Sequence, residues 1–266
     1  MPIKFLHLLT SNQRSHKTNI HLGAYMAFVA GAVNAGGFLA IARYTSHMSG
    51  IISAIGDDLA LNNFISVLGG ISLLLSFLLG AATTAIIVNW GHRRKIRSEF
   101  ALPLLVEAVL LLAFGLVGAN LNLYLPLTVP AIALLLCFVM GLQNAIVTKA
   151  SKAEIRTTHM TGVITDIGIE LGKMIYWNRS KDANKQGLVK ANIEKLKTHT
   201  FIFGMFLVGG IIGAVSFKKV GYIAVVPLSL SLVLISGFQV YRDIKQILFP
   251  QVSALGRWLT DSPTDG

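Results

Sequence analysis

Two short polar motifs centred on histidine are the residues of this sequence best suited to chemistry. Residues 46–50 read Ser-His-Met-Ser-Gly, residues 158–162 read Thr-His-Met-Thr-Gly, and His47 and His159 lie 112 positions apart. A neutral imidazole beside an aqueous cavity can relay protons or bind a ligand. An imidazole that hydrogen-bonds a backbone carbonyl at a helix break explains the pattern about as well.

Acidic residues follow the motifs. Asp58 and Glu170 also lie 112 positions apart, and Asp166 precedes Glu170 by four residues, on one face of a helix. Carboxylates at membrane depth suit cation or proton coupling, although a solvated interfacial position explains them nearly as well. Glu107 stands alone in an apolar block, where it either titrates in a polar interior or is a protonated structural group.

A longer repeat precedes each motif. Residues 28–35 match residues 138–145 at an offset of 110, and the match pairs Asn34 with Asn144. These amides either bind a substrate or hydrogen-bond a facing helix, which is the more frequent use. A repeat of this length indicates that one membrane unit was doubled. Symmetric positions near a repeat axis are where such proteins bind ligands.

The composition is that of an integral membrane protein. Of 266 residues, 53% are hydrophobic and 13% are charged, the mean hydropathy is +0.65, and the apolar residues fall in long blocks. The net charge of +11 comes from Lys and Arg between those blocks, which predicts membrane topology and not nucleic-acid binding. The single cysteine, Cys137, allows no disulfide within the chain, and no spacing indicates a metal or a cofactor.

Six blocks are long enough to cross a bilayer. They cover roughly residues 22–42, 64–88, 100–118, 127–147, 201–217 and 222–240. With both termini in the cytoplasm, this arrangement places 20 of the 23 Lys and Arg residues inside. If the stretches 46–60 and 158–172 also crossed, the split would be 10 against 13. The positive-inside rule therefore favours six crossings.

The two shorter stretches are predicted to be broken or re-entrant helices. Ser49 and Thr161 are good N-cap types, so helices beginning there would aim free N–H groups, near Gly50 and Gly162, into the bundle. Amphipathic helices lying along the membrane interface are the alternative. Three crossings in each copy make the copies inverted relative to each other.

The chain is thus expected to be one all-α membrane domain over residues 1–266. The first repeat covers about 20–119 and the second about 126–241. A basic cytoplasmic segment covers about 173–199, with an amphipathic surface helix over 184–197. An amphipathic tail covers 242–266, with a surface helix over 244–259.

The motifs resemble those of the YoaK family of bacterial membrane proteins. The resemblance covers roughly residues 20–240 and is carried by 141–145 (Gly-Leu-Gln-Asn-Ala) leading to 157–166 (Thr-Thr-His-Met-Thr-Gly-Val-Ile-Thr-Asp). In that family the position of Asn34 usually carries Asp, and the position of residues 49–51 usually reads Thr-Gly-Asn. The resemblance implies about six spans and a bacterial inner-membrane location, with no established substrate.

These features favour a transporter of a small solute or an ion, with its site between the repeats. A non-transporting scaffold or sensor, which recruits a partner through the basic segment, is the alternative. No catalytic motif indicates an enzyme. The bilayer is the expected partner, and a homo-oligomer is compatible with the sequence. The candidate binding residues are Asn34, His47, Ser49, Gly50, Asp58, Glu107, Asn144, His159, Thr161, Gly162, Asp166 and Glu170.

Overall fold

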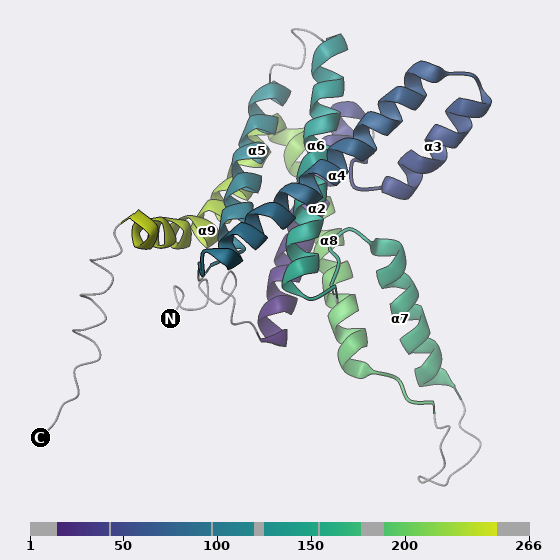
Figure 1. The fold of residues 1–266 in the computed structure, drawn as a ribbon. Helices are drawn as coiled ribbons and strands as arrows, with labels where there is room; N and C mark the ends of the chain where they lie inside the picture. Colours follow the sequence, from purple (N-terminus) through teal and green to yellow (C-terminus); the bar gives the residue numbers. More distant parts are fainter. Residues whose placement is uncertain are drawn as a thin grey trace, which may run out of the picture.

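The structure, a computed structural model, describes residues 15–42, 44–96, 98–119, 125–153, 155–176 and 189–248, and within them it is all-helical (Figure 1). The long helices are α2 (His16–Ile41), α4 (Phe64–Arg93), α5 (Ala101–Ala119), α6 (Leu125–Ala150), α8 (Ile193–Val220) and α9 (Val225–Leu248). Two shorter helices are α3 (Met48–Ala60) and α7 (Met160–Ile175), and a 3-10 turn, η2 (Gly221–Ala224), joins α8 to α9.

The chain is a multi-pass membrane protein. Within the described ranges, five stretches are long and apolar enough to cross a bilayer: His16–Ile41, Phe64–Arg93, Ala101–Ala119, Leu127–Ala150 and Ile193–Asp243. The last has 51 residues and would be about 76 Å long as one helix, more than twice the thickness of the hydrocarbon core. This stretch includes α8, η2 and most of α9. Each of the six predicted blocks therefore overlaps one long helix.

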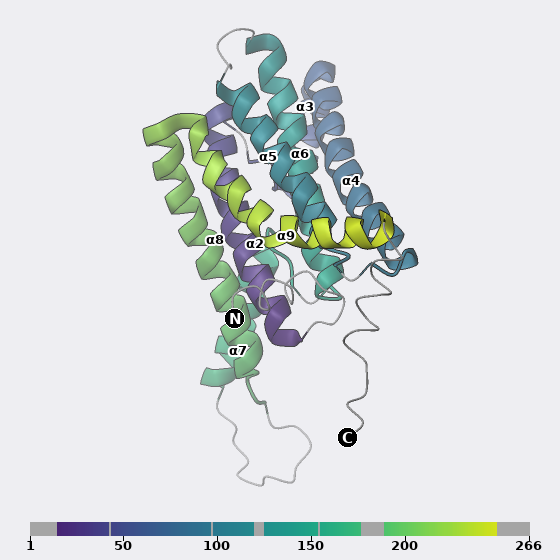
Figure 2. The ribbon, with the colours of Figure 1, turned by 90° about the vertical axis from the view of Figure 1, so that its left-hand side faces the viewer.

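The predicted surface helix over residues 184–197 is wrong in the part that the structure describes. Residues 193–197 form the start of α8, because the Asn192 side chain caps this helix by accepting a hydrogen bond from the backbone N–H of Lys195 at 3.0 Å. Residues 184–188 lie outside the described residues. Residues 242–248 end α9, which turns across the bundle in Figure 2, and 249–266 lie outside the described residues.

The predicted N-caps of the two short helices are also wrong, by two residues. His47 caps α3 and His159 caps α7, while Ser49 and Thr161 lie in the first helical turns. The backbone carbonyl of each histidine already accepts the first helical hydrogen bond, from the N–H four residues on, at 3.2 Å for His47 and 3.1 Å for His159. The helices must therefore begin directly after the histidines.

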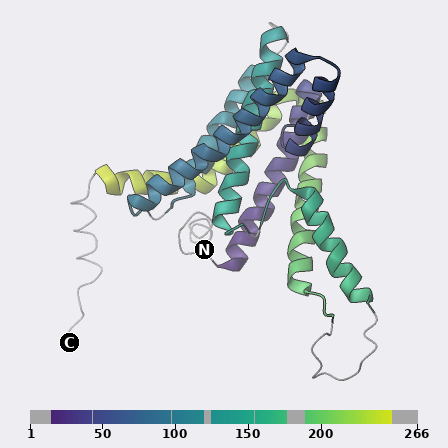
Figure 3. The ribbon, with the colours of Figure 1, turned by 45° about the vertical axis from the view of Figure 1, so that its right-hand side comes forward.

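Each short helix forms a hairpin with the long helix that follows it. In Figures 1 and 3, α3 runs upward from its first residue and α4 returns beside it, whereas α7 runs downward and α8 returns beside it. None of the described residues of α3 is buried, and in α7 only Val163 and Glu170 are buried. The two hairpins thus project from the bundle in opposite directions.

Two glycine-lined crossings hold the bundle together. A Cβ added at any of four glycines would overlap a backbone carbonyl oxygen of the facing helix. The glycine–carbonyl pairs are Gly31 with Phe206 and Gly209 with Phe28, between α2 and α8, and Gly141 with Phe77 and Gly80 with Phe138, between α4 and α6. Absent side chains let these backbones touch, as is common between membrane helices.

Candidate functional site

The two histidine turns share one local geometry. In each, the third residue after the histidine is a glycine, and a Cβ built there would lie against the ring: 2.5 Å from Nδ1 of His47 for Gly50, and closer still to Nδ1 of His159 for Gly162. Each imidazole therefore lies over the first turn of its own helix, in space that another residue would occupy. This requirement explains why both motifs end in glycine.

An asparagine in the preceding long helix anchors each turn. Asn34 of α2 donates from Nδ2 to Ser46 Oγ at 2.6 Å, and Asn144 of α6 donates from Nδ2 to Thr158 Oγ1 at 2.6 Å. The hydroxyl belongs in both cases to the residue directly before the histidine. The sequence repeat is therefore also a repeat of hydrogen bonds, and it fixes where each short helix begins.

The two anchors differ in one hydrogen bond. In the second, Thr157 Oγ1 donates to Asn144 Oδ1 at 3.3 Å. In the first, the equivalent atoms, Thr45 Oγ1 and Asn34 Oδ1, are both buried and have no hydrogen-bond partner among the described residues. An unpaired buried polar atom costs about 1 to 3 kcal/mol. The first turn therefore has more buried polar atoms without a hydrogen bond than the second.

A cavity of about 530 Å³ lies where the two turns converge. It is bounded by α2, by the turn before α3, by the start of α7 and by α8. Its volume falls within the range of small-molecule sites. Its lining includes Asn34, Phe38, Tyr44, Ser46, His47, Thr158, Leu207 and Ala214.

Two smaller cavities lie within the hairpins, at matching positions. One of about 310 Å³ between α3 and α4 is lined by His47, Gly50 and Asp58. The other, of about 430 Å³ between α7 and α8, is lined by His159, Gly162 and Asp166. His47 lines both the first hairpin cavity and the larger shared cavity.

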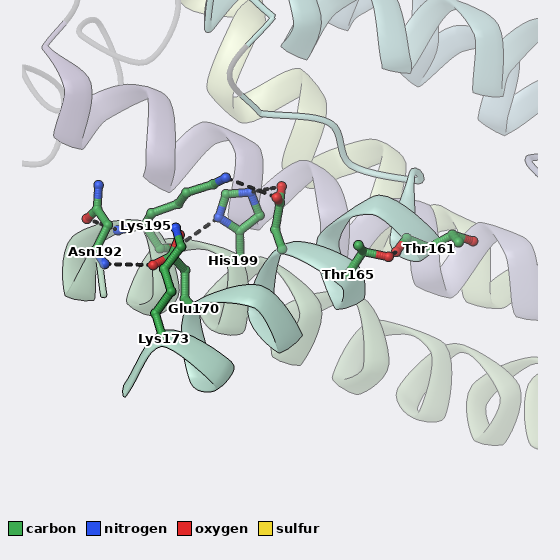
Figure 4. A network of polar contacts seen from close by, with 8 residues as sticks. Thr161, Thr165, Glu170, Lys173, Asn192, Lys195 and His199 are labelled. Atoms are coloured by element: carbon green, nitrogen blue, oxygen red, sulfur yellow. Dashed lines mark hydrogen bonds and ion pairs between the residues drawn. The ribbon is translucent and has the colours of Figure 1, made fainter. Parts of the chain in front are cut away.

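An ionic cluster fixes the second hairpin (Figure 4). Asp166 of α7 accepts a hydrogen bond from Lys195 Nζ at 2.9 Å, and its other oxygen lies 3.4 Å from His199 Nε2, both on α8. Glu170 accepts from Lys173 Nζ at 2.9 Å and from the backbone N–H of Asn192 at 2.7 Å. These contacts tie α7 to the N-terminal turns of α8.

The cluster favours the charged form of both acids. The hydrogen bond from Lys195, more than the charges of Lys195 and His199, holds the pKa of Asp166 below the usual Asp value. The hydrogen bond from Lys173, followed by that from the backbone of Asn192, lowers the pKa of Glu170. Both carboxylates are therefore ionised and paired at neutral pH.

Comparison with known families classifies the chain. A family model described as a protein of unknown function (DUF1275) matches residues 22–238, which is most of the sequence. The chain belongs to this family. DUF1275 is the domain of the YoaK family, so the resemblance seen in the motifs is confirmed. No curated protein and no solved structure matches the chain.

This DUF1275 protein brings only some of the candidate residues together. Asn34 and His47 line the shared cavity, and Asn144 adjoins it through Thr158. Ser49 and Thr161 are exposed in the first turns of α3 and α7. Asp58 is half-buried near the end of α3, where it lines the first hairpin cavity and where Asn63 Nδ2 donates to it at 3.3 Å.

Glu107 lies apart from all of these. It is fully buried in α5, which lines neither the shared cavity nor the two hairpin cavities, and neither carboxyl oxygen has a hydrogen-bond partner among the described residues. Within the described ranges, no three His, Cys, Asp or Glu side chains gather closely enough to hold a metal ion.

Sequence reasoning did not single out Ser46, Thr158, Lys195 and His199 as site residues. The first two directly precede the repeated histidines, so the repeat itself is a signal that could have found them. The other two carry no comparable signal. The positions of α4 that lie 129 residues earlier are Ser66 and Gly70, so the first hairpin has no cation at either of these positions.

Proposed function

We propose that this DUF1275 protein transports a small solute across the bacterial inner membrane and is not an enzyme. In this proposal α2, α4, α5, α6, α8 and α9 cross the bilayer, both termini are cytoplasmic, and α3 and α7 enter it only part of the way. The halves are inverted three-span repeats, and the substrate site is the cavity of about 530 Å³ between their histidine turns.

Reciprocal contacts support the inverted repeat. Helix α2 of the first half packs on α8 of the second, and α6, the counterpart of α2, packs on α4, the counterpart of α8. The glycine pairs at the two crossings occupy matching positions: Gly31 and Gly141 lie 110 apart, and Gly80 and Gly209 lie 129 apart. The opposite directions of α3 and α7 in Figure 1 agree with this arrangement.

The convergence of the two turns on one cavity is the observation that carries the transport proposal. Broken helices that meet between inverted repeats are the common plan of secondary transporters, because irregular backbone is tolerated at membrane depth where it lines a cavity. Rocking of one half against the other would expose such a cavity to each side in turn.

Thiol labelling tests this without knowledge of the solute. Cys137 is buried, so Cys137→Ala gives a background without cysteine. In it, Ala214→Cys places a thiol in the cavity wall, and Ala82→Cys places a control thiol on the exposed face of α4. A membrane-impermeant thiol reagent is added to right-side-out and to inside-out vesicles.

Transport predicts that position 214 reacts from both sides and that position 82 reacts from neither. Reaction of position 214 from neither side would favour the scaffold alternative, which requires a dry interior. Reaction from one side only would indicate a sensor pocket with a single opening, and would also contradict transport.

A further inference from the structure

The described lining of the shared cavity offers no fixed charge to a ligand. Among the lining residues that the structure describes, none is Lys, Arg, Asp or Glu, and the polar side chains are Asn34, Tyr44, Ser46, His47 and Thr158. A charged ligand at membrane depth loses its hydration, and this cost is high without a counter-ion or a set of oriented dipoles. Among these described lining residues, His47 alone has a side chain of the basic type.

The outer wall of the cavity is apolar and exposed. Phe38 and Leu39 of α2 are 42% and 53% exposed, and Leu207 and Ile211 of α8 are 50% and 56% exposed. All four lie on candidate membrane spans, and Figure 2 shows α8 at the edge of the bundle beside α2. Side chains of this kind on a membrane span face lipid. The cavity therefore opens sideways, toward the acyl chains.

Its polar wall is neutral and incompletely hydrogen-bonded. Asn34, only 7% exposed, donates to Ser46 Oγ, while its own amide oxygen has no partner among the described residues. If the Asn34 side-chain amide rotates, its Oδ1 can accept a hydrogen bond from a ligand hydroxyl that lies beside Ser46. Hydroxyl and amide groups of the protein can hydrogen-bond such a head group without any charge.

We infer that the cavity binds neutral amphiphiles, molecules with an apolar body and an uncharged hydroxyl or amide head, which enter it from the bilayer. The inference rests on the proposed function for its biological setting, because such a molecule would be the transported solute. The apolar wall takes the body of the ligand, and Asn34, Ser46 and Thr158 take the head.

Photolabelling with three matched probes tests this assignment. Diazirine derivatives of 1-octanol, octanoate and octylamine carry the same chain and differ only in the charge of the head. Each is added, at equal mole fraction in the membrane, to the wild-type protein in lipid nanodiscs. After illumination, the labelled residues are mapped by mass spectrometry.

The 1-octanol probe is expected to label the cavity at least tenfold more than either charged probe, and excess 1-octanol should compete with it. Ser46→Ala should reduce this labelling severalfold, whereas Ser49→Ala, which changes an exposed hydroxyl outside the cavity, should not. Equal or stronger labelling by octanoate or octylamine would overturn the inference. Labelling spread over the lipid-facing surface without competition would overturn it too.

The outcome is separable from that of the transport test. Saturable labelling by the 1-octanol probe together with no thiol reaction at position 214 would mean binding without transport. Thiol reaction from both sides together with stronger labelling by a charged probe would mean transport of a different chemical class.

Discussion

Replacing Gly209 by alanine should destabilise the protein, whereas replacing Gly204 by alanine on the same helix should not. A Cβ at position 209 would overlap the carbonyl oxygen of Phe28 and lie 2.8 Å from its Cα, whereas a Cβ at position 204 meets nothing within 4 Å. Both substitutions gain the same intrinsic helix propensity, about 1 kcal/mol on soluble scales. The difference between them therefore isolates the contact of α8 with α2.

The magnitude follows from the overlap. Ordinary contact begins near 3.4 Å, so restoring it at the Phe28 Cα alone moves the two helices apart by about 0.6 Å. A gap of roughly 0.5–1 Å forfeits a quarter to a half of the dispersion energy of the atoms that face each other. Overpacking of this kind costs about 1–3 kcal/mol. Because the propensity gain is the same in both variants and cancels, the two should differ by about 1–3 kcal/mol.

The assay is reversible unfolding of both variants in the same nanodiscs or detergent, read as the free energy of unfolding. Gly80→Ala, which would meet the carbonyl of Phe138, and Gly69→Ala, which meets nothing within 4 Å, repeat the comparison on α4. Equal stability of Gly209→Ala and Gly204→Ala would refute the close crossing. A large loss at Gly80 without one at Gly209 would refute the equivalence of the two crossings.

Four further substitutions have defined outcomes in the same assay. Thr157→Val should cost about 1–2 kcal/mol because it removes the hydrogen bond to Asn144, whereas Thr45→Val removes an unpaired hydroxyl and should be neutral or stabilising; the reverse order would contradict the assigned network. Asp166→Asn should cost about 0.5 kcal/mol, a small value because the ion pair is partly exposed. The pKa of Asp166 is lowered in the folded protein, so the stability difference between the wild type and this variant should be full above pH 3.8, the ordinary Asp value. It should vanish as the pH falls through the lowered pKa. A stability difference that does not change with pH would disprove the ion pair. Glu107→Met should stabilise by about 1–3 kcal/mol because neither carboxyl oxygen has a partner in the described residues, and a loss of stability would reveal one.

Much of the architecture could be predicted because a membrane helix depends mainly on the residues of its own segment. The hydrocarbon core requires runs of about twenty apolar residues, and each of the six predicted blocks overlaps one long helix. The short helices after the histidine motifs were also predicted, although their first residues were misplaced by two. Helix boundaries depend on which carbonyl accepts the first hydrogen bond, and residue type alone does not specify it.

The roles of the acids could not be predicted in the same way. The sequence left open whether Asp166 and Glu170 lie at membrane depth or at a solvated interface. Their partners Lys195 and Asn192 come from the start of α8 and its N-cap, where the sequence has no repeat signal. Repetition of Asp58 and Glu170 suggested equivalent roles, yet Glu170 is buried in an ionic cluster, while Asp58 is half-buried and accepts a hydrogen bond from the Asn63 amide. Two acids at matching positions of α3 and α7 can therefore have different partners, because the partners are supplied by the segments that follow.

By itself the sequence determined the membrane class, the helical blocks, the repeated motifs and the residues of the two histidine turns, because these depend on hydrophobicity and on contacts a few residues apart. Only the tertiary structure decided that α2 packs on α8 and α6 on α4, and that both turns therefore border one cavity. Those contacts join residues more than a hundred positions apart through glycines and backbone carbonyls. No side-chain pattern records such a contact, because what permits it is the absence of a side chain.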